Sequence, residues 1–315
     1  MEITEPLDLT DDEANLLDMH SVLNVMNLIM LELMEISKKL GNDSAIYALL
    51  DNTAEAAESL CDPEAAQRHM ENIDSFITTV QSTIDTAAAS LSPEEKGAIG
   101  INRDNLDSIF SVVRIRAAEL VSRKASPSEW IPFDIHELRR NFNEFLSAVE
   151  KNSKGRYRIV NNVAQHEEGD YLVNFDISTS CGNPFHMPAI FQDVMRDLLA
   201  NARKYTPPGG SINGGLFCDG EALRYVVIDT GRGIPSGELG SVVRFGHRAQ
   251  NALDHPTRGG GFGLTKAWYV TQRHGGRMWI ESRTAEESGD GSSGTRVEIR
   301  IPIPEQYRVS PSSPS

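Results

Sequence analysis

The 315-residue chain carries 45 acidic and 30 basic side chains, for a formal net charge of -15. This length predicts roughly two domains, each able to bury its own core. The acidic balance argues against a general binder of nucleic acid, which would need a basic surface, but it leaves room for a nucleotide site built from a few local basic residues.

The cysteines and the apolar segments predict a cytoplasmic protein. Cys61, Cys181 and Cys218 are odd in number and form no CxxC pair, so we expect free thiols in a reducing compartment. The N-terminus lacks a basic, apolar signal sequence. The longest apolar stretch, residues 16–36, is interrupted by polar and charged side chains, and we expect it not to span a membrane.

Residues 1–125 are predicted to form a helical bundle. In the first helix Leu16, Met19, Leu23 and Met26 recur at steps of three and four, which places them on one apolar stripe. Further helices are predicted over residues 45–60, 64–89 and 103–123. The dipeptides Asp62-Pro63 and Ser92-Pro93 indicate breaks between them.

Residues 126–307 are predicted to form a mixed α/β domain, and residues 308–315 a polar, disordered tail. Strand-like runs alternate with three helix-like runs, which predicts a two-layer α/β sandwich. The expected strands cover residues 158–163, 172–177, 223–229, 278–282 and 295–302. The expected helices cover residues 135–151, 188–204 and 263–273.

Three segments of this second domain carry the side chains suited to binding a magnesium–nucleotide complex. They are Asp197-Leu-Leu-Ala-Asn201-Ala-Arg-Lys204-Tyr205-Thr206, Asp229-Thr-Gly231-Arg-Gly233-Ile-Pro235 and Gly259-Gly-Gly261-Phe-Gly263-Leu264-Thr265. An amide oxygen such as that of Asn201 suits magnesium, and Lys204 is placed to reach phosphate as a point charge. The third segment is expected to cradle phosphates with backbone N–H groups at the start of a helix.

In this order the segments resemble the N, G1 and G2 boxes of the ATPase fold shared by gyrase, MutL and the sensor histidine kinases. His274-Gly275-Gly276-Arg277-Met-Trp279-Ile-Glu281-Ser282 resembles the histidine-kinase branch. The resemblance implies that Asn201 coordinates Mg²⁺, that Tyr205 lies against the adenine or ribose, and that Asp229 accepts from the adenine amine. It also implies that residues 243–258 form a lid in which Arg248 or Arg258 reaches the γ-phosphate.

Asp197 lies four residues before Asn201, on the same helical face. Many histidine kinases have asparagine at this position, and gyrase-type ATPases have a glutamate general base. Three roles stay open for Asp197: a second magnesium ligand, a weak general base, or a solvated helix residue.

The resemblance implies a phosphoacceptor histidine on the first helix of a dimeric helical hairpin, and His20 is the candidate. A neutral imidazole is nucleophilic near pH 7. The family usually has an acidic residue directly after the histidine, but this chain has Ser21. Asn24 shares a face with His20 and matches the family residue that orients water for dephosphorylation, and His69 is the second candidate acceptor.

The expected protein is thus a cytoplasmic, homodimeric histidine kinase that binds ATP and Mg²⁺ and exchanges phosphate with a response regulator, as kinase or phosphatase. A separate sensor protein is its expected input. Two alternatives stay open: an ATP-binding adaptor without autokinase activity, and a serine kinase of the anti-sigma-factor type. Phosphohistidine is acid-labile and phosphoserine acid-stable, which separates the two chemistries.

Overall fold

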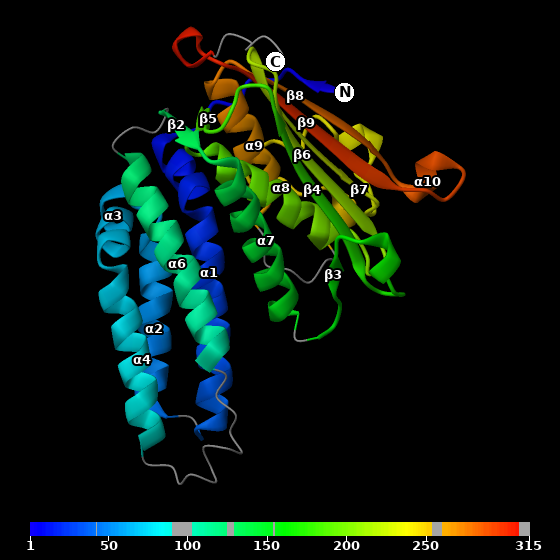
Figure 1. Cartoon of the computed structure of the whole chain (residues 1–315). Coiled ribbons are helices and arrows are strands. Elements are labelled where there is room, and N and C mark those ends of the chain that lie inside the picture. Colours follow the sequence, from blue (N-terminus) through cyan, green and yellow to red (C-terminus); the bar gives the residue numbers. More distant parts are fainter. Residues whose placement is uncertain (42, 90–102, 125–128, 154, 254–259, 309–315) are drawn as a thin grey trace. The chain divides into compact units, whose positions relative to one another are not determined.

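The computed structural model describes residues 1–41, 43–89, 103–124, 129–153, 155–253 and 260–308 (Figure 1). The chain divides into two compact units, one of residues 9–126 and one of residues 1–8 with 127–315. The expected helical domain of residues 1–125 therefore has to be corrected at its start. Residues 1–8 belong to the second unit because β1 (Glu2–Ile3) pairs with its sheet.

The unit of residues 9–126 is helical. Its described helices are α1 (Asp11–Lys39), α2 (Ser44–Ser59), α3 (Pro63–Glu71), α4 (Ile73–Ala89) and α6 (Arg103–Lys124). The helix expected over residues 64–89 is in fact two helices, α3 and α4, separated at Asn72. The start of α1 is fixed by a capping box in which Thr10 accepts from the Glu13 N–H and Glu13 accepts from the Thr10 N–H.

Helices α1, α2, α4 and α6 enclose one apolar core. Helix α1 contacts α2 and α6, and α4 contacts the same two helices from the other side. Val22, Ile29 and Leu33 of α1 are fully buried in this core. By length and composition alone α1 is apolar enough to cross a membrane, contrary to our expectation, but its buried stripe is that of a core helix in a bundle.

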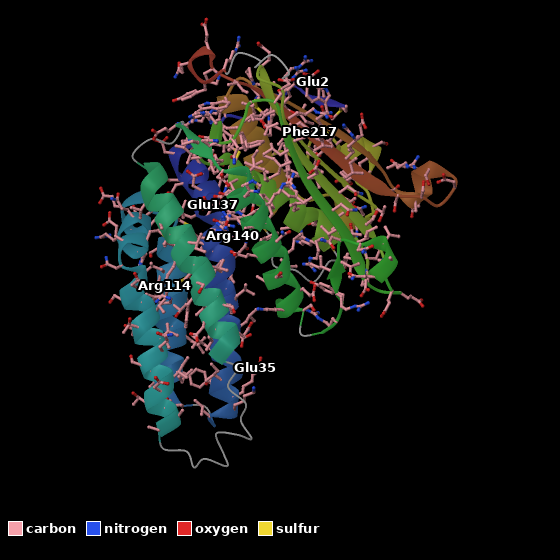
Figure 2. The ribbon with its side chains drawn as sticks, viewed as in Figure 1. Glu2, Glu35, Arg114, Glu137, Arg140 and Phe217 are labelled. Carbon is pink, nitrogen blue, oxygen red and sulfur yellow. A yellow bond between two sulfur atoms is a disulfide. The ribbon has the colours of Figure 1, made fainter. Side chains whose placement is uncertain are left out.

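Helices α4 and α6 carry an internal repeat that sequence reasoning overlooked. Asn-Ile-Asp-Ser-Phe-Ile-Thr-Thr-Val over residues 72–80 matches Asn-Leu-Asp-Ser-Ile-Phe-Ser-Val-Val over residues 105–113. The polar contacts between the two helices are reciprocal. Arg114 donates to Asp74 at 2.6 Å, and Gln81, at the position equivalent to Arg114, donates to Asp107, the equivalent of Asp74, at 3.2 Å (Arg114 is labelled in Figure 2). The pair is therefore locally two-fold symmetric within one chain.

The second unit is built on a seven-stranded mixed sheet with the order β1-β8-β9-β7-β6-β4-β3. Strands β3 (Ile159–Val160), β4 (Tyr171–Thr179) and β6 (Ser211–Cys218) are parallel to one another. Strands β7 (Ala222–Asp229), β9 (Gly294–Pro302) and β8 (Arg277–Arg283) follow in antiparallel order. At the edge, Glu2 of β1 forms an ion pair with Arg277 at 2.6 Å (Figure 2).

Helices α7 (Ile135–Asn152), α8 (Phe191–Tyr205) and α9 (Phe262–Arg273) pack on one face of this sheet, and β2 (Trp130–Phe133) pairs with β5 (Phe185–Pro188) beside them (Figure 1). The short helix α10 (Ala285–Ser288) connects β8 to β9. The expected fold class, a helical bundle followed by a two-layer α/β sandwich, is confirmed.

Strand β6 was not expected because its Gly214-Gly215 pair interrupts the apolar run. A Cβ atom at Gly214 would lie 2.9 Å from the Phe175 ring, so glycine lets α8 and its neighbours approach.

The prediction that all three cysteines are free was wrong for two of them. Cys181 and Cys218 form a disulfide with their Cα atoms 6.2 Å apart, and Cys61 is free. The cause is the parallel register of β4 and β6, which pairs Thr179 with Cys218 and so brings together cysteines separated by 37 residues in the sequence. Spacing along the chain gave no sign of this contact.

Candidate functional site

The C-terminal half of α8 brings the first and third of the three predicted nucleotide-binding segments together. Asp193, Asp197 and Asn201 are spaced by four residues and share one face of the helix. Gly263, in the first turn of α9, lies against that face. A Cβ atom at Gly263 would overlap the Asn201 side-chain amide. Only glycine at position 263 leaves room for the amide in this position.

Lys204, at the end of α8, lies in a cluster of positive charge. Burial, together with the nearby Arg248 and Arg203, lowers the pKa of Lys204 to about 8. Its ammonium lies 5.0 Å from the centre of the Tyr205 ring. Like charges repel, so this cluster is suited to an anionic ligand that would neutralise it.

The second segment folds over the end of α8. The Gly231 N–H donates to the Asp229 carboxylate at 2.8 Å, and the Arg232 N–H donates to the Tyr205 carbonyl at 3.1 Å. A Cβ atom at Gly231 would lie 2.8 Å from that carbonyl, so close backbone contact requires glycine there. Gly233 has a positive φ, at 73°, whereas Gly231 does not.

The Asp229 carboxyl group ends β7 in a half-buried position. Burial raises its pKa to about 6, and hydrogen bonds from the Gly231 and Thr295 backbones partly oppose that shift. One carboxylate oxygen holds the turn through Gly231. A carboxylate so placed can accept a hydrogen bond from a ligand amine.

The third segment leads directly into α9. Gly261 has a φ of 78° and caps the helix, and Leu264 packs partly buried against the domain core. Thr265, which we expected at the nucleotide, is fully buried, and its hydroxyl donates to the carbonyls of Arg244 and Gly261 at 3.0 and 3.2 Å. Thr265 therefore fastens the preceding segment to α9. Gly259 lies outside the described residues.

The segment expected to act as a lid is described up to residue 253, and Arg258 lies outside the described residues. Phe245 packs on Phe262 of α9, with ring centroids 5.0 Å apart. Arg248 donates to the Ala252 carbonyl, while its Nε atom is buried without a hydrogen-bond partner in the described part of the chain. Of the two expected arginines, Arg248 is thus the one that the structure places near Lys204.

A group that sequence reasoning missed lies beside Asp197. The Lys266 side chain of α9 is fully buried, and its ammonium lies 3.4 Å from Asp193 and 3.7 Å from Asp197. Arg196 completes the cluster with an ion pair to Asp193 at 2.9 Å. Asp197 is only 17% exposed, which excludes the solvated-helix role. The sequence did offer a signal, because the spacing of Lys266 along α9 places it on the buried face of that helix. A buried lysine needs a carboxylate partner.

The residues present fit a magnesium–nucleotide complex. Among the described residues, no cluster of three or more histidine, cysteine, aspartate or glutamate side chains could hold a metal ion without help. A single amide ligand such as Asn201 suits Mg²⁺, which usually takes its other ligands from phosphates and water. The crowded Asn201 amide and the basic cluster around Lys204 supply the donor set that such a complex needs.

In the helical unit, the structure brings His20 and Asn24 together on α1. The Asn24 side-chain amide nitrogen lies 3.1 Å from His20 Nε2. This distance permits a hydrogen bond between the two side chains, in which the role of Nε2 depends on the tautomer of the imidazole.

Ser21 is buried. It is 8% exposed, and its hydroxyl oxygen is buried without a hydrogen-bond partner among the residues the structure describes. A carboxylate at this position would be buried in the same place, at a large cost in desolvation. The orientation of α1 thus explains why the position directly after His20 carries no acidic residue.

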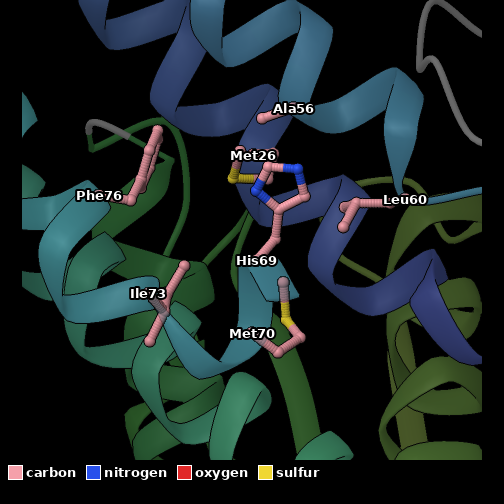
Figure 3. Close-up of a pocket in the computed structure, with 7 residues that line it drawn as sticks. All are labelled: Met26, Ala56, Leu60, His69, Met70, Ile73 and Phe76. Carbon is pink, nitrogen blue, oxygen red and sulfur yellow. The ribbon is translucent and has the colours of Figure 1, made fainter. Parts of the chain in front are cut away.

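His69, the second candidate acceptor, is held inside the bundle. Its Nε2 lies 2.8 Å from the Ser59 hydroxyl oxygen. Figure 3 shows its ring at an apolar cavity that is also lined by Met26, Ala56, Leu60, Met70, Ile73 and Phe76. His20, with a solvent-exposed asparagine beside it, is the better placed of the two for an incoming phosphoryl group.

Residues 187–305 match the family of histidine kinase-, DNA gyrase B- and HSP90-like ATPases. Two curated relatives are kinases. The chain is 31% identical over 126 residues to the adaptive-response sensory kinase SasA of Synechocystis sp., covering 40% of this chain and 32% of that protein. It is 35% identical over 112 residues to the histidine protein kinase DivJ of Caulobacter vibrioides, covering 36% and 17%.

Solved structures of histidine kinases are similar to this chain at low identity. A mycobacterial sensor histidine kinase, MprB, matches 55% of this chain and 97% of its own, with 23% identity and a TM-score of 0.38. Full-length ShkA in complex with AMPPNP matches 71% of this chain and 41% of its own, with 18% identity and a TM-score of 0.42. The match to the ATPase family covers residues 187–305, and the chain spans about a third or less of the curated relatives.

Proposed function

We propose that this chain is an ATP-dependent histidine kinase of a two-component system. The observation that carries the proposal is the combination, in one chain, of a match to the histidine kinase-, gyrase- and HSP90-like ATPases and a bundle helix on which Asn24 lies 3.1 Å from His20 Nε2. An imidazole attacks phosphorus through an unprotonated ring nitrogen.

In the proposed reaction, the Asn201 amide oxygen would hold Mg²⁺, and Lys204 and Arg248 would bind the phosphates. Asp229 accepts from the adenine amine and so selects adenine over guanine, which has a carbonyl at that place. The magnesium ion, when bound, neutralises phosphate charge. Catalysis then depends mainly on positioning and charge neutralisation, because phosphoryl transfer requires little covalent chemistry from the protein.

The His20 Nε2 lone pair forms the bond to the γ-phosphorus while the bond from that phosphorus to the bridging oxygen breaks and ADP leaves. Asn24 must move away from Nε2 for this step, since its amide nitrogen lies 3.1 Å from that atom. We further propose that the phosphoryl group passes to an aspartate of a response regulator, and that Asn24 orients water in the reverse, phosphatase reaction. A separate protein would supply the input signal.

We propose a homodimer formed through the helical unit. The apolar core needs no second copy, because four helices of one chain enclose it. A dimer would instead use the exposed apolar side chains of α1, namely Leu28, Leu31 and Met34, which are 38%, 49% and 44% exposed. A cytoplasmic location is proposed as well, although the Cys181–Cys218 disulfide is unusual for that compartment.

Incubation with ATP labelled at the γ-phosphate tests this function against its two alternatives. Acid-labile label on the protein supports a histidine kinase. Acid-stable label would favour the serine kinase, and nucleotide binding without any label would favour the adaptor.

A further inference from the structure

The ion cluster around Lys266 is built from two neighbouring helices. Asp193, Arg196 and Asp197 are on α8, and Lys266 is on α9. Lys266 is fully buried, and Asp193 and Arg196 are 2% and 8% exposed. The cluster holds equal numbers of positive and negative charges, which is the condition under which buried charges are tolerated.

The cluster lies next to the proposed magnesium ligand. Asp197 precedes Asn201 by one helical turn on α8, and Lys266 follows Gly263 by three residues on α9. Both residues of each pair therefore lie on the helix face that contacts the other helix. The same helix pair thus holds the Gly263–Asn201 contact and the Lys266–Asp197 ion pair at 3.7 Å. The position of α9 relative to the Asn201 amide depends on both contacts.

The Asp197 carboxylate has one buried oxygen, Oδ2, which accepts no hydrogen bond within the described residues. The ammonium of Lys266 is the cation that lies near it. Without that ammonium, a buried carboxylate would face the helix interface one turn from Asn201. Either the helices would separate there or the carboxylate would turn toward the magnesium–phosphate complex.

We propose that Lys266 is a positioning residue for the nucleotide site, acting on Asn201 through its ion pair with Asp197. The proposal rests on the proposed role of Asn201 in holding magnesium and not on autophosphorylation of His20. It assigns Asp197 the role of anchor for α9, which is none of the three roles left open by the sequence.

The test measures affinity for Mg²⁺–ADP by titration calorimetry, together with the thermal unfolding midpoint, in the full chain. Lys266→Met removes the charge and keeps the length of the side chain. We expect about a tenfold loss of affinity, typical of residues that orient a metal ligand. Adding Asp197→Asn restores charge balance at Asn201, and we expect this double variant to regain most of the lost affinity.

A second double variant, Lys266→Met with Asp193→Asn, is the matched control. It has the same net charge but leaves the Asp197 carboxylate beside Asn201 without its cation. We expect it to regain thermal stability and not affinity. Equal affinity in the two double variants would overturn the proposal, since that is the result of a purely structural cluster. The comparison stands even if the single variant does not fold.

Absence of Mg²⁺–ADP binding in the parent chain would contradict the proposed nucleotide site itself, and with it the premise of this proposal. Binding in the parent with no label on His20 would contradict the proposed kinase and leave the role of Lys266 standing. Wild-type affinity in folded Lys266→Met would contradict the role of Lys266 alone.

Discussion

Asp229 accepts a hydrogen bond from the Gly231 N–H at 2.8 Å, and the same carboxyl group is buried enough to raise its pKa to about 6. One residue therefore holds the glycine turn and offers an acceptor for adenine. The Asp229 carboxyl group therefore changes its ionisation within a pH range in which nucleotide binding can be measured.

We expect the affinity for Mg²⁺–ATP to fall as the pH decreases below about 6. An amine donated to the carboxylate favours the ionised form, so the pKa of Asp229 is lower in the complex than in the free protein. Between those two values binding must release a proton, which costs up to about tenfold in affinity per pH unit. Asp229→Asn should remove this dependence. An unchanged ratio of parent to variant affinity between about pH 5 and about pH 7, roughly one unit on either side of that pKa, would contradict it.

The affinity should also fall as the pH rises above about 8, because of Lys204. Burial and its arginine neighbours lower the pKa of Lys204 to about 8. Bound phosphates favour the ammonium and raise that pKa, so binding must take up a proton at higher pH. Lys204→Met should bind more weakly at neutral pH and lack the alkaline decrease. Protonation of the nucleotide affects parent and variant alike, and a decrease of equal steepness in both would exclude Lys204 as its source.

Gly263→Ala is expected to weaken Mg²⁺–ATP binding by at least about tenfold, an effect in the range of overpacked sites. The added methyl group would overlap the Asn201 amide. Gly237→Ala is the control, because a Cβ atom there meets nothing within 4 Å. Titration calorimetry measures both affinities. Equal binding by the two variants would show that the Gly263–Asn201 contact does not position the magnesium ligand.

The disulfide should be detectable and stabilising. Without reductant, an alkylating reagent should modify only Cys61 in the folded protein, as read by mass spectrometry. Replacing Cys181 and Cys218 by serine should lower the free energy of unfolding by about 2–4 kcal/mol, because a loop of this length constrains the unfolded chain. Rapid alkylation of all three cysteines in the unreduced protein would show that the bond does not form in solution.

The sequence predicted the parts of this structure whose signals are local. The spacing of Asp197 and Asn201 predicted a shared helical face, and the glycine segments predicted a turn after β7 and a loop before α9. Contacts between distant segments left little local signal. The Cys181–Cys218 bond depends on the register of β4 and β6, and the pairing of β1 with β8 joins the two ends of the domain.

In the candidate site, too, local features were predictable from the sequence and contacts between distant segments were not. Lys266 would be taken as a solvated lysine until α9 packs on α8 and buries it against Asp193 and Asp197. Thr265 was expected at the nucleotide because it ends a glycine-rich segment, yet it faces inward and donates to Arg244. The outcome at both positions depends on which face α9 turns to the sheet and to α8, and that is decided by packing.

The central claim is tested most directly by incubating the full chain with Mg²⁺ and ATP labelled at the γ-phosphate. Parent, His20→Ala and the matched control His69→Ala are compared. The account predicts acid-labile label on the parent and on His69→Ala, and none on His20→Ala. Acid-labile label that persists on His20→Ala and disappears from His69→Ala would contradict the assignment of His20, and acid-stable label on all three would contradict histidine chemistry altogether.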